Sequence, residues 1–176
     1  HLPPSFFIGG NTKQVWENIL RDDYDNWDVP TLQEEYNAYK QDNPLPYKEL
    51  IFPDVLKVLN EVKSRGLKIG LASSSVKADI LRALEENHLD GFFDVVLSGE
   101  EFKESKPNPE IYLTALKHLN VEANQALIIE DSEKGIAAGV AAGVEVWAIK
   151  DNRFDMDQGA AKGLLDNLMD VLDLLK

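Results

Sequence analysis

The fold of this chain is decided by residues 126–135, which read ALIIEDSEKG. The apolar residues Ala126–Ile129 predict a buried strand, and the carboxylates of Glu130 and Asp131 follow it directly. Small residues around Gly135–Ala142 then predict a helix. Because the strands of a parallel sheet end at one edge, where ligands bind, we expect both carboxylates at such an edge.

From about residue 53 onward, the chain alternates predicted helices and strands with short connections. That alternation is typical of βα units stacked around a parallel sheet. The predicted strands are Leu67–Ala72, Phe92–Leu97, Ala126–Ile129 and Val144–Ile149. The predicted helices begin at Pro53 and Pro109, include Ile80–Leu84 and Gly135–Ala142, and end the chain near Gly163–Leu175.

Residues 1 to about 50 carry helical patterns and no predicted strand. Two pairs have the spacing of capping boxes at helix starts, Asn11 with Gln14 and Thr31 with Glu34. The prolines in Asn43–Pro46 cannot continue a helix, so the helical segment is expected to end there.

The sequence therefore predicts an α/β fold in two parts. Residues 1–49 are expected to form a helical cap subdomain, and residues 50–176 a core with a Rossmann-like parallel sheet.

Composition narrows the function further. The chain has 176 residues with 44% apolar content, enough for one globular domain with a small subdomain. A net charge of −13 opposes nucleic acid as a partner, because such affinity comes from cations that neutralise phosphates. The absence of cysteine excludes disulfides and thiolate metal sites, which leaves a hard metal held by oxygen as the available alternative.

The sequence also leads to expectations about where the protein is located and where its native chain begins. The sequence has no run of about eighteen apolar residues and no visible signal peptide, so we expect a cytoplasmic protein without a membrane partner, and favour a monomer. No initiator methionine precedes His1, and we expect the native chain to begin upstream.

The serines that follow the strand Leu67–Ala72 are candidate phosphate ligands. The hydroxyl of Ser73, with the N–H groups of Ser74 and Ser75, can hold a phosphate oxygen at the start of a helix. The alternative is that Ser73 is an ordinary helix N-cap.

Glu130 and Asp131 are candidate metal ligands. Adjacent like charges near a core are costly unless a cation lies between them, and Mg²⁺ with oxygen ligands is suited to that role. The alternative is an N-cap followed by an acidic residue in the first turn of a helix.

Lys106 lies in the loop Ser105-Lys106-Pro107-Asn108-Pro109, which two prolines stiffen. A fixed lysine would suit an ammonium that must meet both a phosphate and a carboxylate cluster. The alternative is a solvated loop lysine.

Together, these segments resemble three of the four motifs of the haloacid dehalogenase superfamily, close to its β-phosphoglucomutase group. The resemblance is carried by Leu71-Ala72-Ser73, by Ser105–Pro109 and by Ile128–Gly135, and it extends along the chain from Leu50. It implies a core sheet with a helical cap and a reaction through an aspartyl-phosphate on a small phosphorylated metabolite.

The resemblance also implies residue roles. Ser73 would bind the transferring phosphoryl group, Lys106 would offset negative charge, and Glu130 with Asp131 would hold Mg²⁺ directly or through water. The candidate catalytic residues are thus Ser73 and Lys106. The candidate phosphate and substrate ligands are Ser73, Ser74, Ser75, Lys77, Lys13, Lys106 and Asn108.

The sequence departs from the family at its first motif, an apolar strand ending in Asp-x-Asp that supplies the nucleophile. No strand of this sequence matches it, so the chain as printed is expected to be inactive. Since that strand is central to the family's sheet, we expect about thirty upstream residues, without which the core would contain a hole.

The predicted cap departs as well. The mutases have an arginine that binds the second phosphate, and this sequence has Asn11-Thr12-Lys13 at that place. A lysine cannot make the two parallel hydrogen bonds that an arginine makes to a phosphate. Ser75 and Lys77 match core positions near the same phosphate, although Lys77 could equally be an exposed helix lysine.

The function expected of the whole protein is therefore Mg²⁺-dependent phosphoryl transfer, with a sugar phosphate favoured as substrate. Water as acceptor would make it a phosphatase, and a sugar hydroxyl would make it a mutase. A non-catalytic phosphate-binding or regulatory protein is the alternative. A haloacid dehalogenase is the least favoured function. Halide displacement needs no metal to neutralise a phosphate, so a metal site with two carboxylates would have no role.

Overall fold

The structure is a computed structural model that describes residue 2 and residues 6–175. Helices and strands alternate from α4 onward, as expected of βα units. The helices are α1 (Thr12–Leu20), α2 (Val29–Asp42), α3 (Tyr47–Leu50), α4 (Val55–Ser64), α5 (Lys77–Glu86), α6 (Glu110–Leu119), α7 (Glu133–Ala141) and α8 (Val171–Leu174). The strands are β1 (Gly70–Ser73), β2 (Val95–Ser98), β3 (Leu127–Glu130), β4 (Glu145–Ile149) and β5 (Gly163–Leu165).

All strand pairs are parallel, which confirms the predicted α/β class. The strands form two sheets rather than the one expected, in the orders β1-β2 and β3-β4-β5. Ala72 of β1 pairs with Leu97 of β2, and Ile129 of β3 pairs with Trp147 of β4. On the sides facing away from β2 and β4, β1 and β3 have no strand partner among the described residues.

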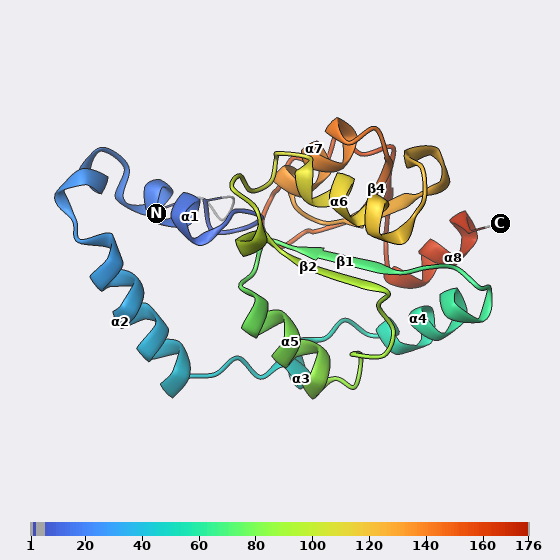
Figure 1. Cartoon of the computed structure of the whole chain (residues 1–176), viewed down its shortest axis with the longest axis horizontal. Coiled ribbons are helices and arrows are strands. Elements are labelled where there is room, and N and C mark those ends of the chain that lie inside the picture. Colours follow the sequence, from blue (N-terminus) through green and yellow to red (C-terminus); the bar gives the residue numbers. More distant parts are fainter. Residues whose placement is uncertain (1, 3–5, 176) are drawn as a thin grey trace.

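Helices cover both faces of β1 and β2, with α6 on one side and α5 on the other (Figure 1). The period of two along the strands explains this, since alternate residues point to opposite faces. Leu97 faces a core cluster with Ile111 and Tyr112 of α6, whereas Leu71 and Val96 pack against Ile80 and Leu84 of α5. Each large apolar side chain buried in this way contributes roughly 1.5–3 kcal/mol.

The segment before α4 is built differently. Helices α1 and α2 contain no buried residue, and α2 extends away from the sheets (Figure 1). The capping box of Asn11 and Gln14 is confirmed, and α2 ends before Asn43 as the prolines predict. The predicted division between residues 49 and 50 falls inside α3 and stays a prediction.

Two sequence predictions of local structure are wrong. Thr31 does not cap α2, because Asp28 does so by accepting hydrogen bonds from the N–H and hydroxyl of Thr31. The C-terminal helix near Gly163–Leu175 is only α8, and Gly163 opens β5 instead. A side chain at Gly163 would meet the ring of Trp147 on the neighbouring strand at 2.4 Å, so this glycine suits close strand packing.

In the part of the chain that the structure describes, no helix is both long and apolar enough to cross a membrane.

Candidate active site

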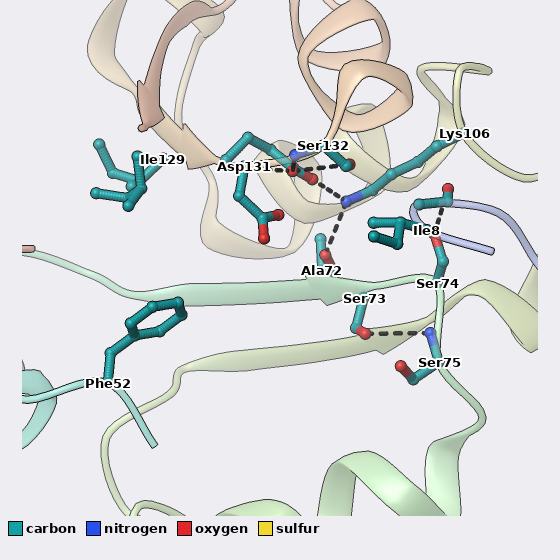
Figure 2. Close-up of a pocket in the computed structure, with 13 residues that line it drawn as sticks. Ile8, Phe52, Ala72, Ser73, Ser74, Ser75, Lys106, Ile129, Asp131 and Ser132 are labelled. Atoms are coloured by element: carbon teal, nitrogen blue, oxygen red, sulfur yellow. Dashed lines mark hydrogen bonds and ion pairs between the residues drawn. The ribbon is translucent and has the colours of Figure 1, made fainter. Parts of the chain in front are cut away.

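A cavity of about 400 Å³ lies between the two sheets, at the carboxyl ends of β1 and β3. Ala72 and Ser73 of β1 line one side of it, and Ile129 and Glu130 of β3 line the other. The remaining lining residues include Ser74, Ser75, Lys106, Asp131 and Ser132, together with Ile8, Gly9 and Phe52 (Figure 2). Six of the predicted site residues therefore meet in one place: Ser73, Ser74, Ser75, Lys106, Glu130 and Asp131.

Ser73 ends β1 with its hydroxyl oxygen accepting a hydrogen bond from the N–H of Ser75 at 3.1 Å. Its own hydroxyl proton is therefore free to point to a ligand in the cavity. The alternative that Ser73 is an N-cap is wrong, because α5 begins at Lys77 and its N-cap is Val76.

Lys106 is buried, with 4% of its surface exposed, so the alternative of a solvated loop lysine is wrong. Its ammonium donates to Glu130 Oε1 at 2.5 Å and to the carbonyl oxygen of Ala72 at 3.1 Å (Figure 2). Lys106 thus links the ends of the two sheets across the cavity.

Glu130 is fully engaged by protein donors. Its Oε1 accepts from Lys106 and from the hydroxyl of Tyr112, and its Oε2 accepts from the N–H of Asp131 and from the N–H and hydroxyl of Ser132. Burial alone would raise the pKa of Glu130, but Lys106 and these hydrogen bonds outweigh it and hold the pKa well below its ordinary value. Glu130 is therefore a charged anchor.

Gly135 makes room for that anchor. A side chain there would put its first carbon on the carboxylate of Glu130, which lies over the start of α7. Ser132 is the N-cap of α7 and accepts from the N–H of Gly135 at 3.1 Å. The alternative that Glu130 and Asp131 are an N-cap and a first-turn acid is wrong, because both precede the cap.

Asp131 differs from Glu130, since no described residue donates a hydrogen bond to its carboxylate, which points into the cavity (Figure 2). Burial raises its pKa, and the charges of Glu130 and Asp151 raise it further. No described residue forms a salt bridge with this carboxylate, and a bound cation would offset its charge.

The loop before α1 covers part of the cavity. Ser74 donates its hydroxyl proton to the carbonyl oxygen of Gly9 at 3.1 Å. Gly9 has a φ of +75°, and a side chain there would meet the hydroxyl of Ser132 at 2.9 Å. A glycine is thus required both by the backbone conformation and by the close approach.

Three predicted substrate ligands lie outside this cavity. Lys77 turns its ammonium to the carbonyl oxygen of Val96 and to Glu101, because these acceptors lie beside the start of α5. Lys13 and Asn108 line a second cavity of about 550 Å³ between α1 and the loop before α6. Their roles in binding substrate stay predictions that this placement does not support.

Sequence reasoning missed two residues that hold the site. Neither Tyr112 nor Gln158 is among the predicted site residues. Gln158 donates to the carbonyl oxygens of Asp131 and Ile149, both at 2.8 Å, and so ties the ends of β3 and β4 together. A buried hydroxyl needs a partner, and that requirement was the available signal for Tyr112.

Comparison with known proteins decides the family. The haloacid dehalogenase-like hydrolase family matches residues 4–149. The chain belongs to this family. The motifs on which the resemblance rested lie within the matched residues, and the site is built from them.

Individual relatives agree. A phosphorylated carbohydrates phosphatase of Thermotoga maritima is 35% identical over 129 residues, and the match covers 70% of this chain and 59% of that protein. The chain thus spans about six-tenths of this relative's length.

Two solved structures are similar in fold. CbbY from Rhodobacter sphaeroides in complex with xylulose-(1,5)bisphosphate matches with a TM-score of 0.60 and 28% identity, over 66% of this chain and 53% of that one. The β-phosphoglucomutase of Clostridium difficile matches with a TM-score of 0.80 and 24% identity, over 96% of this chain and 78% of that one, and shows the fold alone.

Proposed function

We propose that the whole protein transfers a phosphoryl group from a small phosphorylated metabolite, with a sugar phosphate as the favoured substrate class. One observation carries the proposal: a buried lysine ammonium, a strand-end serine hydroxyl and a carboxylate with no salt-bridge partner among the described residues share one cavity. Phosphoryl transfer depends mainly on positioning and on the neutralisation of dispersed negative charge, and these groups are suited to both tasks.

The residues present fit a magnesium ion. Asp131 would supply an oxygen ligand, since its carboxylate has no salt-bridge partner among the described residues, and Glu130 would add its negative charge nearby. When bound, Mg²⁺ offsets the charge on the phosphoryl oxygens. Ser73 would bind one of those oxygens, and Lys106 would offset charge from the other side of the cavity.

We propose further that the nucleophile is an aspartate outside the 176 residues, on a strand between β1 and β3. The separate sheets support this, since among the described residues β1 and β3 have no strand partner on the sides toward the cavity. An aspartate at the carboxyl end of such a strand would attack phosphorus and displace the substrate oxygen. Water or a sugar hydroxyl would then take the phosphoryl group from the aspartate.

The relatives support the substrate class. One is a phosphatase of phosphorylated carbohydrates, and another binds a sugar bisphosphate. Both ligands combine a phosphate with a hydroxylated carbon chain, which suits a cavity with serines on one side and a lysine on the other.

The test is an assay of the full-length protein on a panel of sugar phosphates with Mg²⁺, measuring both released phosphate and isomerised sugar. We expect turnover of at least one sugar phosphate, reduced about ten- to a hundredfold in Ser73→Ala. Ser64→Ala is the matched control, because the Ser64 hydroxyl donates to the carbonyl of Glu61 at an exposed helix end, away from the cavity. Binding of sugar phosphates without any turnover would overturn the proposal and favour the non-catalytic alternative.

A further inference from the structure

Tyr112 contacts both charged partners of the buried pair in the site. Its hydroxyl donates to Glu130 Oε1 at 2.8 Å, and its ring centroid lies 4.7 Å from the ammonium of Lys106. Tyr112 is 7% exposed and reaches the pair from α6, within the core cluster that includes Leu97 of β2. The side chain of Tyr112 therefore contacts both the carboxylate of Glu130 and the ammonium of Lys106.

The hydroxyl of Tyr112 acts as a donor only. It donates its proton to Glu130 Oε1, which it shares with Lys106, while the other carboxylate oxygen accepts from Asp131 and Ser132. This fixes the carboxylate at both oxygens.

The ring supplies the second restraint. An ammonium over an aromatic face is attracted by the ring's quadrupole, and more strongly where water is excluded. Lys106 has three N–H donors, of which Glu130 and the carbonyl of Ala72 take two. With the ring on one side, the third N–H is left for a ligand in the cavity.

We propose that Tyr112 is a positioning residue that sets the place of the Lys106 ammonium, by its ring directly and by its hydroxyl through Glu130. The catalytic consequence rests on the proposed function. A purely structural role would need only the ring, since phenylalanine fills nearly the same space without burying a hydroxyl that needs a partner.

The test compares Tyr112→Phe, which keeps the ring, with Tyr112→Leu, which removes ring and hydroxyl. Tyr47→Phe is the matched control, because Tyr47 packs on Arg82 and does not line the cavity. The first readout is the rate at which an amine-reactive reagent labels Lys106 in the full-length protein, divided by the rate for Lys63. It requires no turnover.

We expect the labelling ratio to rise several-fold in Tyr112→Phe, to rise further in Tyr112→Leu, and to stay unchanged in Tyr47→Phe. The second readout is steady-state kinetics on a sugar phosphate, where Tyr112→Phe should lower kcat about three- to tenfold with KM little changed. An unchanged labelling ratio in Tyr112→Phe would overturn the proposal. If the wild type turns over no phosphate ester, the proposed function fails, and the labelling ratio still decides the role of Tyr112.

Discussion

The site and the helical segment before it hold their charges in opposite ways. Lys106 is paired with Glu130 inside the core, with side chains only 5% and 9% exposed. Lys13 of α1 faces Glu17 at 3.6 Å, with side chains 72% and 44% exposed. Burial fixes the first pair in one geometry, whereas solvent screens the second. The fixed charges suit chemistry, and the exposed ones leave room for specificity to vary.

The largest expected effect comes from breaking the buried pair. Lys106→Met leaves the carboxylate of Glu130 buried without its cation, so the free energy of unfolding should fall by about 3 kcal/mol. Lys63→Met is the control, since Lys63 pairs with Asp94 at the surface and its loss should cost under about 1 kcal/mol. Urea unfolding measures both, and equal losses would show that burial does not distinguish the pairs.

A smaller effect is expected from placing a side chain against the carboxylate of Glu130. Gly135→Ala forces the carboxylate of Glu130 aside and should destabilise the fold by about 1–3 kcal/mol. Gly91→Ala is the control, because nothing lies within 4 Å of the added carbon. Thermal unfolding compares the two, and a neutral Gly135→Ala would contradict the described position of Glu130.

The contact between the loop and the core should matter less. Ser74→Ala removes the hydrogen bond to the carbonyl of Gly9 and should cost about 1 kcal/mol where that contact forms. If the loop closes over bound substrate, KM rises about fivefold while kcat changes little. A change in kcat alone would place Ser74 in the chemistry instead.

The smallest effect concerns pH. The hydrogen bond from Lys63 and that from the N–H of Ile69 hold the pKa of Asp94 below its ordinary value. The folded pKa therefore lies below the unfolded one, so the stabilisation is complete above about pH 4 and is lost as pH falls through the folded value. Asp94→Asn should lower stability by under about 1 kcal/mol at pH 7, and the difference from the wild type should vanish in acid.

The sequence predicted the site better than its surroundings. Strand ends were predictable because apolar runs such as Ala126–Ile129 stop at polar residues, and β3 ends within one residue of the prediction. The burial of Lys106 was not, since it depends on Glu130 and Tyr112 reaching it from other elements. β5 was missed because Gly163–Leu165 is too short to show a period.

The contacts of Lys77 could not be predicted from the sequence either. Lys77 was expected at a phosphate, but the carbonyl of Val96 and the carboxylate of Glu101 lie nearer in the fold. Such competition between acceptors depends on tertiary contacts that spacing along the chain does not reveal.

The proposed role of Asp131 in Mg²⁺-dependent phosphoryl transfer is tested most directly by Asp131→Asn in the full-length protein. The substitution removes a buried charge that repels Glu130 and Asp151, so without metal the unfolding temperature should stay the same or rise. Release of phosphate from a sugar phosphate at saturating Mg²⁺ should fall at least about a hundredfold. Turnover equal to that of the wild type, with an unchanged dependence on Mg²⁺, would contradict the account.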